Sequence, residues 1–170
     1  MDIFAHAFWT NAVFYKKYAA EKAQRYWAIF FGVMPDLISF TPAQIYFFLN
    51  RVTFNPALFE TNANWTLRYA VASYNVSHSF ITFLVVLLIV TAARKGKIYW
   101  PLWGWALHIG VDVFSHKGFF ETPLLYPLSG FKFHHGISWA HPEFMLINYS
   151  ALAAVYLFWF FVLRKKYAQN

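Results

Sequence analysis

The longest apolar stretches of the chain lie at residues 70–93, which contain the run FITFLVVLLIVTAA, and at residues 146–163, which end at three basic residues. At about 1.5 Å per helical residue, either stretch is long enough to cross a bilayer core of about 30 Å. A third stretch, residues 99–114, carries His108 and Asp112. The helical face that bears these two residues must therefore face protein rather than lipid. We predict membrane helices at all three positions.

The first forty residues resemble a helical hairpin in their pattern, with arms at residues 3–18 and 24–34. Pro35 follows the second arm and is expected to stop it, because proline lacks the backbone N–H and restricts the preceding residue. Asp36 should then lie where a helix breaks. Residues 40–68 and 117–142 are rich in turn-forming residues and are predicted to be connections, the first with a short amphipathic helix at residues 44–49.

Composition agrees with a membrane protein. The chain is 59% hydrophobic and only 12% charged, which is more apolar surface than a soluble domain of 170 residues could bury. The net charge of +7 comes from residues at the ends of apolar runs, so it indicates topology and lipid contact rather than nucleic-acid binding. We predict an all-α bundle of about five membrane-embedded helices, forming one domain over residues 1–170.

Ten of the 14 Lys and Arg residues fall in three clusters, at residues 16–25, 94–97 and 164–166. Five spans with the N-terminus outside and the C-terminus in the cytoplasm would place all three clusters inside, as the positive-inside rule requires. The predicted location is therefore the inner (cytoplasmic) membrane, with membrane lipid as a partner.

The apolar stretches contain ionisable residues that a membrane excludes unless they are used. The clearest set is in LHIGVDVFSH, where spacings of four residues put three ligand-type side chains on one helical face. Counted along the helices, the candidates other than His116 lie about 15–24 Å from the nearest basic cluster, all in the outer half of the membrane. The candidates that could converge there are His6, Asp36, His78, His108, Asp112 and His116.

Imidazoles and carboxylates without any cysteine suit a divalent metal, with zinc preferred and manganese or iron as alternatives. Two carboxylates, Asp36 and Asp112, are enough to hold more than one ion. A metal would also compensate their charge at membrane depth. An ion open to the outer face could activate water and polarise a phosphoryl or carbonyl oxygen, which is the design of a hydrolase.

These residues resemble a known family, the membrane-bound metal-dependent hydrolases of bacteria and archaea. The resemblance covers most of the chain, and it rests on the segments DIFAHAFW, GVMPDLIS, VSHSF, LHIGVDVFSH and TPLLYPLS. The order of His and Asp residues is also similar to that of bacterial zinc phospholipase C and the related single-strand nucleases. The resemblance implies His6, Asp36, His78, His108 and Asp112 as ligands, with His116 as a candidate sixth.

Simpler interpretations stay open at each position. His6 and His78 could be buried residues that only pack between helices. The strip from His108 to His116 could form a hydrogen-bond network between helices, and Asp36 could cap a helix. The outer-loop residues are expected to be solvated or interfacial, although one histidine could close over the site. Those residues are His134, His135, His141, Glu121 and Glu143, and candidate substrate or supporting contacts are Asn75, Ser79 and Thr122.

The preferred prediction is a hydrolase of a phosphate ester, on a lipid or another membrane-associated substrate, with Asp36 and Asp112 as catalytic carboxylates. One of these carboxylates would also act as general base. The alternatives are a membrane protein that carries or senses a metal or holds a regulatory partner, and a purely structural protein with a polar packing network.

Overall fold

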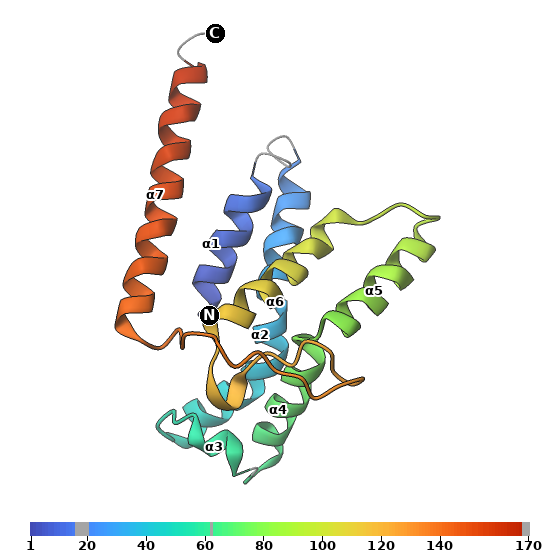
Figure 1. The fold of residues 1–170 in the computed structure, drawn as a ribbon, viewed down its shortest axis with the longest axis vertical. Helices are drawn as coiled ribbons and strands as arrows, with labels where there is room; N and C mark the ends of the chain where they lie inside the picture. The colour runs from blue at the N-terminus through green and yellow to red at the C-terminus, as the bar shows by residue number, and fades with distance from the viewer. Residues whose placement is uncertain (16–20, 62, 168–170) are drawn as a thin grey trace.

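The computed structural model describes residues 1–15, 21–61 and 63–167, and this part of the chain is helical, without strands. Helices α1, α2 and α6 pack together in the middle, α7 stands on one side, and α5 leans away on the other (Figure 1). The elements are α1 (Ile3–Phe14), α2 (Lys22–Asn50), α3 (Ala57–Glu60), α4 (Trp65–Ser77), α5 (Phe80–Ala93), η1 (Trp100–Leu102), α6 (Trp103–Ser115), η2 (Gly118–Phe120) and α7 (Pro142–Tyr167).

Within the described residues, two helices are long and apolar enough to cross a membrane: α2, and α7 over Pro142–Phe161. The pair α4 and α5 makes a third span if the two are counted together, since they meet at a bend of 65°. The prediction of five spans is therefore wrong. Helices α1 and α6 have only 12 and 13 residues, so each covers roughly 18–20 Å, well short of the bilayer core.

Helix α2 differs most from the expectation. It continues through Pro35 and Pro42 to Asn50, so Pro35 does not end it, and the predicted separate helix at residues 44–49 is its last part. Pro35 is buried where α2 packs against neighbouring helices. In a membrane helix such neighbours compensate the hydrogen bond that proline removes, which is why the proline is tolerated.

The apolar stretch at residues 70–93 is not one straight helix. It divides between Ser77 and Phe80, where His78 ends α4 and Ser79 caps α5 by accepting hydrogen bonds from the N–H groups of Ile81 and Thr82. The N–H of Phe80 donates to the carbonyl of Leu124 in the 116–141 loop, at 2.9 Å. The break is therefore supported by a side chain and by a distant loop, and it leaves His78 at the bend.

The ends that carry basic residues lie toward one side of the molecule. The start of α2, the end of α5 and the end of α7 all point the same way, and α3 and the 116–141 loop lie at the other end (Figure 1). Lys16 and Lys17 lie outside the described residues. For the described residues, the direction of these helix ends agrees with the prediction that the basic clusters share one face of the membrane.

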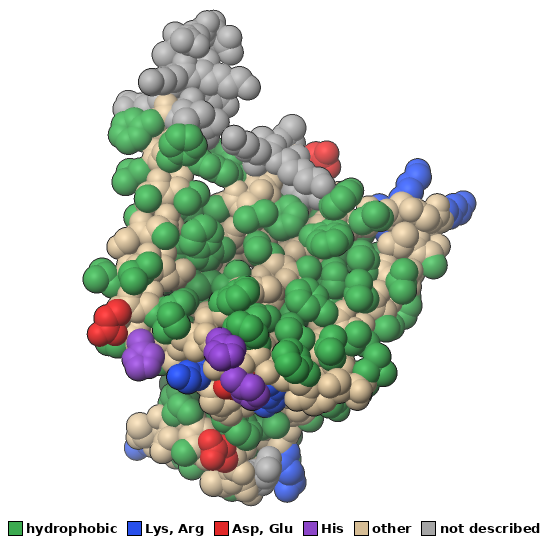
Figure 2. Space-filling model, in the orientation of Figure 1, with side chains coloured by type: hydrophobic (Ala, Val, Ile, Leu, Met, Phe, Trp, Pro, Cys, Tyr) green, Lys and Arg blue, Asp and Glu red, His purple; other side chains and the backbone are tan. Residues whose placement is uncertain are grey.

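Large apolar side chains are spread over the face of the bundle drawn in Figure 2, and many are exposed. Leu88 on α5 is 68% exposed and Phe158 on α7 is 62% exposed, and neither packs into a protein core. Such a surface is stable only against hydrocarbon or another apolar partner.

Glycines bring the central helices into close contact. A Cβ atom at Gly104 of α6 would lie 2.1 Å from the carbonyl oxygen of Ala28 in α2, and one at Gly32 would lie 2.3 Å from Oγ1 of Thr10 in α1. Small residues at these crossings let membrane helices approach closely. The close approach of α2 and α6 positions their polar side chains opposite each other.

We expect Gly104→Ala to destabilise the protein by about 1–3 kcal/mol, because the added methyl group meets backbone that cannot move alone. Gly110→Ala is the matched control in the same helix, since a Cβ there meets nothing within 4 Å and should stabilise by up to about 1 kcal/mol. Unfolding in detergent measures both. Equal stability of the two variants would contradict the close packing of α2 on α6.

Candidate metal centre

Helix α6 provides the central pair of the site. His108 and Asp112 lie one turn apart, and Nε2 of His108 is 3.0 Å from Oδ2 of Asp112. Both side chains are fully buried. His116 is not on the helix, because α6 ends at Ser115 and His116 has extended backbone. Its Nδ1 nevertheless lies 3.3 Å from Oδ1 of Asp112, so all three predicted residues meet.

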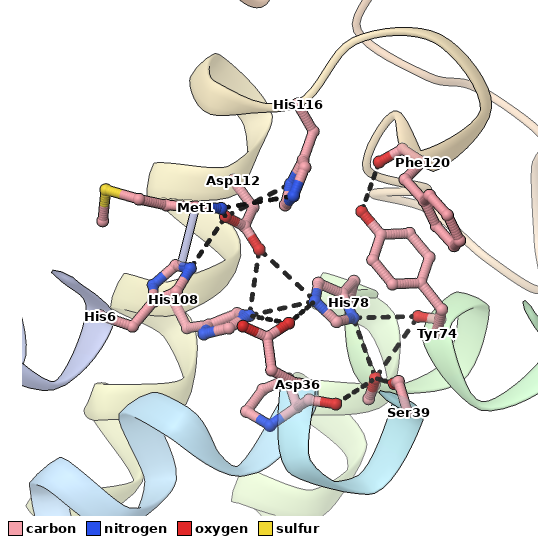
Figure 3. A network of polar contacts seen from close by, with 12 residues as sticks. Met1, His6, Asp36, Ser39, Tyr74, His78, His108, Asp112, His116 and Phe120 are labelled. Atoms are coloured by element: carbon pink, nitrogen blue, oxygen red, sulfur yellow. Dashed lines mark hydrogen bonds and ion pairs between the residues drawn. The ribbon is translucent and has the colours of Figure 1, made fainter. Parts of the chain in front are cut away.

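Two other elements bring the remaining members of a four-residue cluster. Asp36 comes from α2 and His78 from the bend between α4 and α5, and both point toward the α6 pair (Figure 3). One ligand atom from each of Asp36, His78, His108 and Asp112 lies within 4.8 Å of the others. Three of these side chains are completely buried, and Asp36 is the exception, with 12% of its side chain exposed.

The spacing of these atoms fits one divalent ion. Nε2 of His78 lies 3.0 Å from Nε2 of His108 and 3.4 Å from Oδ2 of Asp112, and its distance to Oδ1 of Asp36 is 3.5 Å. Bonds of about 2.0–2.2 Å from zinc to nitrogen or oxygen place tetrahedral ligand atoms roughly 3–4 Å apart. The cluster already has that size.

The hydrogen bonds behind the two histidines decide which nitrogen faces the cluster. Nδ1 of His108 lies 2.8 Å from the carbonyl oxygen of Gly32, and Nδ1 of His78 lies 3.2 Å from that of Tyr74. A carbonyl only accepts, so a neutral His108 carries its hydrogen on Nδ1 and presents a lone pair on Nε2. Nε2 of His78 lies 3.0 Å from that atom and close to both carboxylates, an arrangement that suits a cation.

The other oxygen of Asp112 has its own partners. Oδ1 lies 3.0 Å from Nε2 of His6 and also contacts the amino group of Met1, which is itself 3.3 Å from Nε2 of His116. The His6 ring stacks on His108 with ring centroids 3.7 Å apart. All six residues singled out in the sequence therefore lie together. Asp36, His78 and His108 are grouped with Asp112 in the four-residue cluster, and His6 and His116 lie near Oδ1 of Asp112.

Three buried side-chain atoms of this group make no hydrogen bond within the described residues, although each lies 3.0–3.3 Å from an atom of an ion-pair partner. They are Nε2 of His6, Oδ2 of Asp112 and Nδ1 of His116. Buried polar atoms are normally hydrogen-bonded. These atoms are therefore candidates to bind a cation, and the His and Asp residues of the cluster form a group that could hold a metal ion.

The outer-loop histidines stay away from the cluster. His134, His135 and His141 are exposed, and Nδ1 of His134 pairs with Oε2 of Glu121 at 2.6 Å. Glu121 is buried, contrary to the expectation of a solvated side chain, whereas Glu143 is exposed. Among the suggested supporting residues, Ser79 is a helix cap, Asn75 is half-buried, and Thr122 is buried with its hydroxyl unpaired among the described residues.

Sequence reasoning missed the residues that hold His78 in position. The ring of Tyr74 stacks on His78 with centroids 3.9 Å apart, and its hydroxyl donates to the carbonyl of Phe120 in the 116–141 loop. Oγ of Ser77 lies 2.9 Å from Nδ1 of His78 and 2.9 Å from Oγ of Ser39 on α2. The signal available was the one-turn spacing of Tyr74 and His78, which is too common to be specific.

Comparisons with protein-family models, with curated proteins and with solved structures found no match. The resemblance to membrane-bound metal-dependent hydrolases therefore stays a prediction from the sequence motifs.

We expect Tyr74→Phe to lower the free energy of unfolding by about 1–3 kcal/mol, because the partly buried carbonyl of Phe120 would lose its donor. Tyr69→Phe in the same helix is the control, since Tyr69 is 41% exposed, and its effect should stay within about 0.5 kcal/mol. Thermal unfolding in detergent gives both values. A neutral Tyr74→Phe variant would show that this bond does not hold the loop on α4.

Proposed function

We propose that this protein is a membrane-embedded, metal-dependent hydrolase that cleaves a phosphate ester of a lipid or another membrane-associated substrate. One observation carries the proposal: four atoms of ligand type from three separate parts of the chain lie within 4.8 Å of one another, and one of them, from Asp36, belongs to the candidate membrane span α2. Ionisable groups at membrane depth are costly and are retained where they function.

Asp36, His78, His108 and Asp112 would hold the first ion, with His6 and His116 as further ligands on the other oxygen of Asp112. Zinc suits this nitrogen and oxygen set best, and manganese or iron also fit it. A divalent ion there would activate water and polarise a phosphoryl oxygen. We favour phosphate esters over carbonyl substrates because the order of His and Asp residues resembles that of zinc phospholipase C and the single-strand nucleases, and this preference rests on that resemblance alone.

Other residues would orient the histidines and supply the general base. The carbonyl of Gly32 and the hydroxyl of Ser77 hold the rings of His108 and His78 so that Nε2 faces the centre. Of the two carboxylates in the cluster, Asp36 is the one that reaches the surface, with 12% of its side chain exposed, whereas the Asp112 side chain is fully buried. We assign it the role of general base, because a base must contact the substrate or its attacking water.

We place the protein in the inner membrane with the C-terminus in the cytoplasm. This orientation is supported by the shared direction of the start of α2 and the ends of α5 and α7 (Figure 1) and by the positive-inside rule. The centre then lies in the outer half of the bilayer, which supports a lipid or membrane-associated substrate.

The alternative is a non-enzymatic role in metal binding, transport or regulation, supported by the complete burial of His78, His108 and Asp112. Transport needs a polar path toward the cytoplasm. On that side of the centre Phe14 and Ala28 are buried and pack with Leu107, so the packing there is apolar. This apolar packing supports an enzyme rather than a transporter.

The metal assignment predicts stoichiometric metal in the purified wild-type protein and its loss in Asp112→Ala and His108→Ala. His141→Ala is the control, because it removes an exposed histidine on the 116–141 loop. Elemental analysis after dialysis, with unfolding curves to confirm folding, measures the result. Metal retained in Asp112→Ala would contradict the assignment.

Turnover is tested with bis(p-nitrophenyl) phosphate and a fluorescent phosphatidic acid, using the metal-loaded protein. Asp36→Asn should lower the rate about 10²–10⁴-fold, the usual contribution of a general base. Glu143→Gln, which changes an exposed carboxylate at the start of α7, should leave the rate unchanged. A metal-loaded wild type that cleaves neither compound would favour the non-enzymatic role.

A further inference from the structure

A pocket of about 360 Å³ lies beside the metal centre but is separate from it. It is formed where α2, α4, α5 and α6 meet, and its lining is almost wholly apolar. Ile38, Tyr69 and Val76 form its exposed rim, and each is 41–45% exposed. Ser77 and Trp105 line it deeper, where each is only 5% exposed.

The pocket lies among helices that are candidate membrane spans, so we expect it to face the hydrocarbon layer. Its walls belong to α2 and to the bent pair of α4 and α5, which are candidate membrane spans. The bend of 65° separates the axes of α4 and α5, and Thr82 of α5 lines the space beside Ser73 and Ser77 of α4. Because a void without partner atoms loses dispersion contacts on all its walls, the surrounding medium should fill it. In this layer that medium is lipid chains.

The polar groups in the walls are already occupied. Nε1 of Trp105 donates to the carbonyl of Ser77 at 2.6 Å, and Oγ of Ser77 is shared with Ser39 and His78. Oγ of Ser73 donates to the carbonyl of Tyr69 within its own helix. An occupant therefore gains little from hydrogen bonding to these groups. An apolar chain is the chemistry that fits.

The size of the pocket selects a thin occupant. A volume of about 360 Å³ is near the lower end of small-molecule sites. A transmembrane helix from a partner, about 10–12 Å across with its side chains, would lie over the rim without entering. A single alkyl chain can enter and contact the deep residues.

We propose that this pocket binds one acyl chain of a membrane phospholipid. The chain lies against Ser77 and Trp105, directly behind the histidine that Ser77 positions. The lipid is a bound structural neighbour of the centre, and its binding does not depend on a metal or on turnover. The inference is therefore independent of the proposed hydrolase.

Photo-crosslinking of the full-length protein in nanodiscs tests the proposal. The nanodiscs contain phosphatidylethanolamine and phosphatidylglycerol with a small share of phosphatidylcholine that carries a diazirine in the middle of one acyl chain. Peptide mapping should give adducts on Met34, Ser73 and Trp105 of the pocket. Labelling there should exceed that of Leu88 and Ile89, which are more exposed on α5, at 68% and 62%, and contact only bulk lipid.

Ala72→Phe adds a ring to the pocket wall and should lower pocket labelling about fivefold or more by occupying the space. Val85→Phe is the matched control, since Val85 is 50% exposed on α5 and does not line the pocket. Unfolding curves confirm that both variants fold. Pocket labelling equal to that of Leu88, or unchanged by Ala72→Phe, would overturn the proposal. Absence of lipid labelling in the pocket, together with crosslinks between two protein chains, would overturn the proposal and assign the pocket to a second copy of the chain.

Discussion

The carboxylate of Asp112 is the group around which the bundle is organised. It is fully buried, and an isolated charge in an apolar layer is so costly that partners must surround it. His78 and His108 face one oxygen, His6, His116 and the amino group of Met1 face the other, and these partners come from distant parts of the chain. The need to compensate this one charge therefore fixes how α1, α6 and the bend after α4 are arranged. The apolar exterior adds stability in the membrane but contributes little to how the helices are arranged.

The residues of the His and Asp cluster could be predicted from sequence because the prediction depends on two robust signals. Ionisable residues inside apolar stretches are rare, and a spacing of four residues on a helix brings His108 and Asp112 together whatever surrounds them. Asp36 and His78 required an additional argument from depth, and the structure agrees because α2 and the bend after α4 reach the same level as α6. His116 is the informative exception, since it joins the site from extended backbone just beyond the helix.

Helix boundaries were harder to predict, and each failure has a physical cause. Pro35 breaks an isolated helix, but packing around α2 replaces what proline removes. The break at His78 and Ser79 depends on the Ser79 cap and on the carbonyl of Leu124, which accepts a hydrogen bond from the N–H of Phe80. Leu124 lies 44 residues further along the chain, so a local sequence pattern cannot predict this hydrogen bond. The prediction of five spans failed because α1 and α6 are apolar but have only 12 and 13 residues, too few to cross a bilayer core.

The length of α2 sets the depth of the centre. Its 29 residues extend about 43 Å, which exceeds a hydrocarbon core of about 30 Å. The helix must tilt, or its last turns must project with the aromatic cluster of Phe47 and Phe59 at the headgroup level. Asp36 lies midway along α2, so a thicker bilayer straightens the helix and carries the centre deeper, and a thinner one brings it toward the interface. As a candidate span, α2 would therefore make the depth of the Asp36 cluster depend on bilayer thickness.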